Sequence, residues 1–129
     1  MFVDASALLA ILLDEPEADA FAQQLSAGGC FTSPLALFEV TASLMSRKQI
    51  EWQLADASVS ATLDAAAISV IPITPEIGRL ALVAFERYGK GRGHPAQLNM
   101  GDCFAYACAQ SLAVPLLYKG DDFAHTDLA

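Results

Sequence analysis

Residues 1–13, MFVDASALLAILL, change from one structural pattern to another at a single acidic residue. Met1–Asp4 is a short apolar run, typical of a buried strand, and Ala5–Leu13 is rich in the good helix formers Ala and Leu. Asp4 stands at the junction, where an acidic side chain also caps helices well. This stretch therefore predicts a strand that passes directly into a helix, with Asp4 at the carboxyl end of the strand.

The same alternation continues along the chain. Short apolar strands separated by helices imply an α/β fold with a mainly parallel sheet of about four to five strands. Asp14 is expected to cap the second helix, Ser69–Ile73 to be a buried strand, and the end of the chain to add a short edge strand. The other expected strands are Cys30–Thr32 and Pro115–Tyr118. The helices that follow the first one are expected to end at about Ala27, Lys48, Ala67, Tyr88 and Ala113.

Length and charge narrow the possible functions. A chain of 129 residues corresponds to a single domain, residues 1–129. Its 7 Lys and Arg against 15 Asp and Glu give a formal net charge of -8, which argues against tight duplex DNA binding through a broad basic face. Three cysteines without C-x-x-C spacing are expected to be buried free thiols in the cytoplasm. No run is long enough to span a membrane, and the apolar N-terminus lacks the basic start of a signal peptide.

Acidic residues gather where the predicted strands end. Asp4 ends the first strand, Asp121 and Asp122 follow the last one, and Asp102 lies in the first turn of a helix that begins at Asn99. Ligands of parallel sheets bind at the carboxyl ends of the strands. Carboxylates that converge there without matching Lys or Arg are expected to hold a hard divalent cation, Mg²⁺ or Mn²⁺.

Each acid alone also has a purely structural explanation. Asp4 and Asp102 suit the first turn of a helix, where negative charge is favoured. Asp121-Asp122 after Gly120 is a sequence typical of a turn. Glu39 shares a face of its helix with serines, and such a polar face is typical of the side exposed to solvent. The metal hypothesis therefore depends on all of these residues lying at one edge of the sheet.

Three stretches of the sequence carry a resemblance to a known family. The first is the opening Phe2-Val3-Asp4-Ala5-Ser6-Ala7-Leu8, with a D-x-S motif, and the most specific is Leu98-Asn99-Met100-Gly101-Asp102-Cys103-Phe104-Ala105-Tyr106-Ala107. The third is the tail Leu116–Phe123 with Thr126-Asp127. Together these motifs resemble the VapC toxins, PIN-domain ribonucleases of type II toxin–antitoxin systems, and the resemblance covers essentially the whole chain. It implies a three-layer α/β/α domain and a Mg²⁺- or Mn²⁺-dependent endoribonuclease, usually dimeric and inhibited by a VapB-type antitoxin.

The resemblance also implies roles for single residues. Asp4, Asp102 and Asp121 would hold the metal, with Asp122 as the competitor of Asp121 for the last position. In the same way, Glu39 would ligate through water or orient the nucleophile, Ser6 would hydrogen-bond a carboxylate or the phosphate, and Asn99 would support the site.

Basic residues and apolar helices suggest the partners. Arg87, Lys90 and Arg92 surround the Gly-rich stretch Gly89–Leu98, and Lys119 stands beside the expected site, so these four are candidates for binding RNA. The resemblance implies an RNA substrate, with transfer, ribosomal and messenger RNA all left open. An apolar groove between the helices Ala18–Ala27, Leu35–Met45 and Trp52–Ala67 is expected to accept an antitoxin helix. A basic antitoxin segment would also reach the acidic residues.

Other functional classes have weaker support. The chain has neither a G-x-S-x-G motif nor a phosphate-binding glycine loop of the nucleotide-binding type. Two alternatives stay open at this point. One is a PIN-like interaction module without catalytic activity, and the other is a metal-dependent nuclease that acts on DNA.

Overall fold

The computed structural model describes every residue from Met1 to Ala129 and contains a four-stranded parallel sheet. Its strands are β1 (Phe2–Val3), β2 (Phe31–Thr32), β3 (Ser69–Val70) and β4 (Leu116–Leu117), in the order β3-β2-β1-β4. β1 pairs with β2 and β4, and β2 pairs with β3, all in parallel. The prediction of an α/β fold with a parallel sheet is confirmed.

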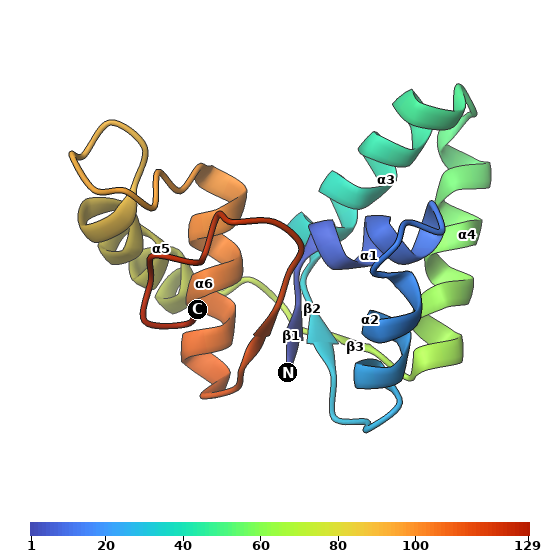
Figure 1. Ribbon diagram of the computed structural model, residues 1–129, viewed down its shortest axis with the longest axis horizontal. Coiled ribbons are helices and arrows are strands. Elements are labelled where there is room, and N and C mark those ends of the chain that lie inside the picture. Colours follow the sequence, from blue (N-terminus) through green and yellow to red (C-terminus); the bar gives the residue numbers. More distant parts are fainter.

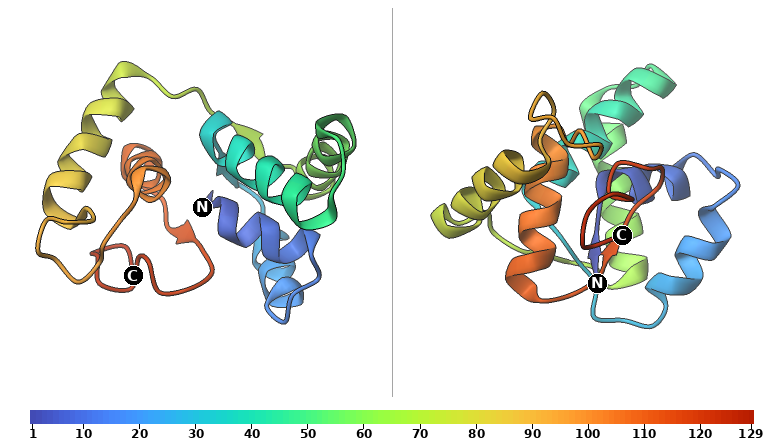
Figure 2. Two further views of the ribbon diagram at one scale, coloured as in Figure 1. Left: turned by 90° about the horizontal axis from the view of Figure 1, so that it is seen from above. Right: turned by 60° about the vertical axis from the view of Figure 1, so that its left-hand side comes forward.

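Helices cover both faces of the sheet (Figure 1). The alternation of side chains along each short strand produces these two layers, because neighbouring residues point to opposite faces. Val3 and Leu117 pack into one core cluster with the first group of helices, and Phe2 and Leu116 pack into a second cluster with the other group. Figure 2 shows the two groups on opposite sides of the sheet. The first group is α1 (Ala5–Leu12), α2 (Ala18–Leu25), α3 (Pro34–Lys48) and α4 (Trp52–Ala66), and the second is α5 (Pro75–Tyr88) and α6 (Met100–Leu112).

Three local predictions are wrong. Asp14 does not cap α2; it has a left-handed backbone with φ of 50° just after α1, and α2 begins only at Ala18. Only Ser69–Val70 of the stretch Ser69–Ile73 forms a strand, and both residues are exposed because β3 lies at the edge of the sheet. The chain after Leu117 forms turns instead of an additional edge strand.

Two further features bear on the sequence analysis. All three cysteines are free and buried, as expected. No helix has both the length and the apolar character that crossing a bilayer requires.

Candidate functional site

An open acidic cleft of about 170 Å³ lies where β1 ends, and α1, α3, α6 and the chain after β4 contribute its walls. Four carboxylates line it, and no lysine or arginine does. The fold therefore brings together the acids that were widely separated in the sequence. The lining residues are Asp4, Ala5, Ser6, Leu9, Glu39, Val40, Ser43, Asp102 and Asp122.

Asp4 is held at the junction between β1 and α1. Its backbone N–H donates to the Leu117 carbonyl of β4 at 2.9 Å, and its side chain caps α1. The carboxylate Oδ2 accepts hydrogen bonds from the Ser6 N–H at 3.1 Å and from the Ser6 hydroxyl at 2.5 Å. Burial raises the pKa of Asp4, although the bonds from Ser6 oppose this shift, and the charge of Asp122 raises it further.

Ser6 connects Asp4 to the chain that follows β4. Its Oγ accepts a hydrogen bond from the Lys119 N–H at 3.0 Å while it donates to Asp4. The Lys119 side chain points elsewhere, because its Nζ pairs with Glu15 at 2.6 Å and with Glu17 at 3.3 Å. Lys119 thus ties the segment between α1 and α2 to the end of β4, and its charge is already compensated. This placement gives no support to the prediction that Lys119 binds phosphate.

Asp102 is fixed by the first turn of α6. The Asn99 side chain accepts from the Asp102 N–H at 2.9 Å, and Asp102 Oδ2 accepts from the Asn99 N–H at 3.1 Å, which forms a capping box. Burial raises the pKa of Asp102 to about 6, with further contributions from the charges of Asp122 and Asp4 and an opposing one from the Asn99 hydrogen bond. Asn99 therefore does not line the cleft but orients one of its acids.

Glu39 reaches the cleft from the second turn of α3, which begins after the capping residue Ser33. Its carboxylate lies against Gly101, so closely that a Cβ atom at position 101 would overlap it. Burial raises the pKa of Glu39 to about 7, and the charges of Asp4 and Asp102 add to the shift. Gly101, whose missing side chain makes room for Glu39, was not among the predicted site residues.

The last acid of the cleft is Asp122 instead of Asp121. Both aspartates are exposed, but Asp122 lines the cleft and Asp121 does not, so the structure places the second of the two candidates beside the other acids. The chain turns at Gly120, whose φ is +96°, and Phe123 is then buried at 1% exposure. This turn and the buried ring set which of the two neighbouring aspartates borders the cleft.

The donor set of the cleft fits a hard divalent cation. Its ligand atoms are carboxylate oxygens, which Mg²⁺ and Mn²⁺ prefer. Burial, and then the neighbouring carboxylates, raise the pKa of Asp4, Glu39 and Asp102, and no lysine or arginine lines the cleft to offset these charges. No three His, Cys, Asp or Glu side chains form a ready-made metal cage, so the carboxylates share a cleft without converging on one point.

The other basic candidates lie outside the cleft. Lys90 and Arg92 are exposed in the segment between α5 and α6, which is closed by hydrogen bonds of Lys90 N–H with Leu98 O at 2.8 Å and of Leu98 N–H with Tyr88 O at 2.9 Å. Arg87 lies over the ring of Tyr88, with 4.6 Å between its guanidinium carbon and the ring centre. This segment leads directly into Asn99 and α6, whose first turn carries Asp102.

Proteins with similar sequences share nearly the full length of this chain. A VapC ribonuclease of Rhizobium meliloti is 42% identical over 98% of this chain and 98% of its own length. Ribonuclease VapC28 of Mycobacterium tuberculosis is 39% identical over 98% of this chain and 93% of its own length.

Solved structures with the same fold are more distant in sequence. VapC20 of Mycobacterium tuberculosis, described as a sarcin-ricin loop cleaving toxin, matches with a TM-score of 0.73 at 16% identity over 95% of this chain and 92% of that chain. A chain in a toxin–antitoxin complex from Klebsiella pneumoniae matches with a TM-score of 0.68 at 19% identity over 98% of this chain and 92% of that chain. The PIN domain model matches residues 1–128. Since the family model and the sequence relatives each cover almost the whole chain, this protein belongs to the PIN domain family and, within it, to the VapC ribonucleases.

Proposed function

We propose that this protein is a Mg²⁺- or Mn²⁺-dependent endoribonuclease and the toxin of a type II toxin–antitoxin pair. The observation that carries the proposal is the cleft at the end of β1, which four carboxylates line with no lysine or arginine among the lining residues. Its sequence relatives named VapC ribonuclease support RNA as the substrate. The absence of a compensating cation supports a metal requirement.

The proposed roles follow from what each acid contacts. Asp4, Asp102 and Asp122 would hold the metal, and Ser6 keeps the Asp4 carboxylate oriented through two hydrogen bonds. When bound, the metal supplies a polarised phosphate oxygen and a water molecule of lowered pKa. Glu39, with a pKa raised to about 7, is suited to orient the attacking water from the α3 side.

RNA would approach along the α6 side of the cleft. Lys90 and Arg92 are exposed, and neither forms an ion pair within the protein. Two unpaired cations beside an acidic site would attract the phosphates that flank the scissile bond. Arg87 is a weaker candidate because it already stacks on Tyr88.

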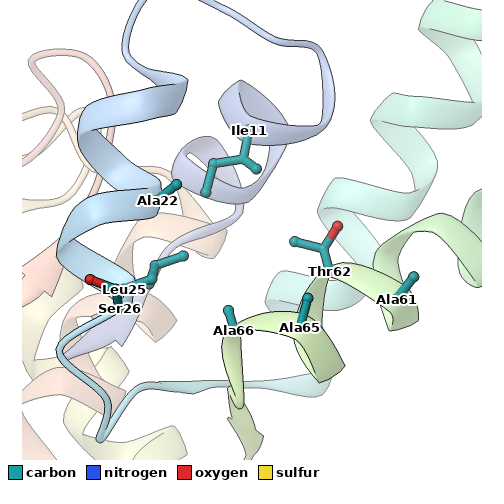
Figure 3. Close-up of a pocket in the computed structure, with 8 residues that line it drawn as sticks. All are labelled: Ile11, Ala22, Leu25, Ser26, Ala61, Thr62, Ala65 and Ala66. Carbon is teal, nitrogen blue, oxygen red and sulfur yellow. The ribbon is translucent and has the colours of Figure 1, made fainter.

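An apolar groove supports the antitoxin as partner. It measures about 430 Å³ and lies between α1, α2 and α4 (Figure 3), so α2 and α4 take part as expected while α1 replaces α3. A Klebsiella pneumoniae relative by fold was solved as a toxin–antitoxin complex. We propose that an apolar antitoxin helix occupies this groove and that a basic segment reaches the acidic cleft. The groove residues are Ile11, Ala22, Leu25, Ser26, Ala61, Thr62, Ala65 and Ala66.

A second copy of the chain is the other proposed partner. Phe38, Leu82, Val83 and Met100 expose 70%, 69%, 63% and 66% of their surface, which is unusual for large apolar side chains. We propose that these residues are covered in a homodimer. Sedimentation at several protein concentrations would test this, and a mass of 13.6 kDa throughout would contradict it.

Cleavage of RNA by matched variants tests the proposed activity. Wild-type protein freed of antitoxin is incubated with total RNA in Mg²⁺ or in EDTA, beside Asp102→Asn and Asp121→Asn. Both substitutions remove one charge and preserve shape, but only Asp102 lines the cleft. We expect discrete cleavage by wild type and by Asp121→Asn in Mg²⁺, and none in EDTA or by Asp102→Asn.

The other outcomes identify the alternatives. Equal cleavage in every lane would indicate a contaminating nuclease, and equal cleavage of DNA and RNA of one sequence would indicate a nuclease that does not recognise the 2′-hydroxyl. Absence of cleavage by folded wild-type protein would favour the interaction module.

A further inference from the structure

Asp122 is held differently from the other acids of the cleft. Asp4 and Asp102 lie in the first turns of α1 and α6, and Glu39 lies within α3. Asp122 belongs to residues 120–129, here called the tail, which contain no helix or strand. Its place in the cleft therefore depends on contacts that attach the tail to the rest of the protein.

The tail has one apolar attachment and one polar attachment. Phe123 is 1% exposed and packs edge-on against Tyr118, with 5.0 Å between the ring centres. Four residues later, Asp127 Oδ1 accepts hydrogen bonds from the Tyr106 hydroxyl at 2.6 Å and from the Tyr88 hydroxyl at 3.2 Å. Both tyrosines are 3% exposed, so these donors come from the core.

Hydrogen bonds within the tail connect the two attachments. The Thr126 hydroxyl donates to the Phe123 carbonyl at 2.8 Å, and the Thr126 N–H donates to the same carbonyl at 3.1 Å. The Ala124 N–H donates to the Asp121 carbonyl at 3.0 Å. These hydrogen bonds restrict the backbone of residues 121–127. An anchor at Asp127 therefore also limits where Asp122 can lie.

The polar attachment also links the positions of Asp102 and Asp122, two acids of the cleft. Tyr106 lies four residues after Asp102, one helical turn along α6. The helix that carries Asp102 thus also carries the hydroxyl that holds the tail with Asp122. In Figure 1 the tail passes beside α6.

We infer that Asp127 is a positioning residue: by accepting hydrogen bonds from Tyr106 and Tyr88, it holds the tail on α6 and sets where Asp122 stands relative to Asp102. The inference deepens the proposed ribonuclease function and rests on it for its effect on cleavage. Asp127 touches neither the cleft nor its acids and acts only through the tail. The Tyr106 hydrogen bond is also the main reason why the pKa of Asp127 lies below its usual value.

The test compares Tyr106→Phe and Asp127→Ala with the control Tyr118→Phe. Tyr118 forms no side-chain hydrogen bond, and phenylalanine preserves the ring that packs on Phe123. Asp127→Asn serves as the conservative variant because an amide oxygen can still accept both hydroxyl protons. Three quantities are measured on the full chain: amide exchange of the tail without metal, affinity for Mn²⁺ alone, and Mg²⁺-dependent RNA cleavage.

We expect faster tail exchange in Tyr106→Phe and Asp127→Ala, with unchanged exchange in β1 and β4. Mn²⁺ affinity and cleavage should each fall about tenfold, as is common when a residue that orients a metal ligand is lost. Asp127→Asn should recover most of this loss, and Tyr118→Phe should match wild type. In an Asp122→Asn background, Asp127→Ala should cause no further loss, because the residue through which it acts has already been changed.

Two results would overturn the inference. One is tail exchange at the wild-type rate in both test variants. The other is an equal fold loss of Mn²⁺ affinity from Asp127→Ala with and without Asp122→Asn, because the effect would then bypass Asp122. If wild type fails to cleave RNA while the exchange and Mn²⁺ results hold, the proposed function fails and the positioning role stands.

Discussion

At the scale of the residue, Gly101 leaves the space that the Glu39 carboxylate occupies. A Cβ at this position would overlap the carboxylate, and the far end of a flexible glutamate yields more easily than backbone does. Gly101→Ala should therefore displace Glu39 from the cleft without unfolding the protein. We expect Mg²⁺-dependent cleavage to fall about tenfold while the free energy of unfolding changes by less than about 1 kcal/mol.

Gly78→Ala is the matched control for this prediction. Gly78 lies inside α5, and a Cβ there would meet no other atom within 4 Å. The substitution should stabilise the protein by about 0.5–1 kcal/mol and preserve cleavage. Urea unfolding and RNA cleavage measure both quantities. Full activity of Gly101→Ala would show that the position of Glu39 does not matter.

The raised pKa values of Glu39 and Asp102 predict how stability depends on pH in the absence of metal. The pKa of Glu39 rises from 4.5 to about 7 and that of Asp102 from 3.8 to about 6 on folding. The folded protein therefore keeps protons that the unfolded chain has already released. This contribution to stability is fully present below about pH 4 and is lost as the pH rises through 6 and 7.

Glu39→Gln isolates one of these contributions. In EDTA at about pH 8, this variant should be more stable than wild type, and at about pH 4, below the unfolded pKa of Glu39, the two should be nearly equal. Mg²⁺ should stabilise wild type at the higher pH, because it binds the folded protein only. Urea midpoints at both pH values, with and without Mg²⁺, give the comparison. A constant difference between the two proteins at every pH would refute the explanation.

At the scale of the element, helix starts position two of the four acids. Asp4 is the N-cap of α1, and Asp102, the third residue of α6, completes the capping box of that helix with Asn99. Asp4 directly follows β1, so its side chain lies at the carboxyl end of the sheet. Because both side chains cap a helix and also line the cleft, the structural explanation of each acid is compatible with the metal-binding role that we propose.

Asn99→Ala tests whether the cap of α6 serves the site as well as the fold. Losing a cap costs about 1 kcal/mol of stability, and here it also frees the Asp102 side chain. Thr74→Ala is the control, since Thr74 caps α5 by accepting from the Ile77 N–H at 3.2 Å and does not line the cleft. We expect similar losses of stability in urea unfolding but reduced cleavage in Asn99→Ala alone. Equal activity of both variants would restrict Asn99 to a structural role.

At the scale of the whole molecule, local patterns predicted most of the elements, and the expected parallel sheet led to the prediction that Asp4 and Asp102 share one edge. The strand order was not predicted, and Glu39 was assigned to the site only through the resemblance to the VapC toxins. The choice of Asp122 over Asp121 depends on the turn at Gly120 and on the burial of Phe123. The pairing of Lys119 with Glu15 and Glu17 joins parts of the chain that no local pattern relates. Contacts of this kind arise only in the folded chain.

The separation of the apolar groove from the acidic cleft predicts that inhibition can be lost without loss of catalysis. The groove lies between α1, α2 and α4, and none of its lining residues lines the cleft. Ala61→Glu would introduce a charge into the groove at an exposed position of α4.

Ser60→Glu adds the same charge at a neighbouring exposed position outside the groove. We expect Ala61→Glu to weaken antitoxin binding at least about tenfold, because a buried unpaired charge in an apolar contact costs more than 1.4 kcal/mol. Ser60→Glu should bind like wild type, and both variants should cleave RNA normally once freed of antitoxin. Calorimetric titration with the cognate antitoxin and the cleavage assay measure the two effects. Unchanged binding by Ala61→Glu would mean that the antitoxin helix docks elsewhere, and reduced cleavage would mean that the groove and the cleft are coupled.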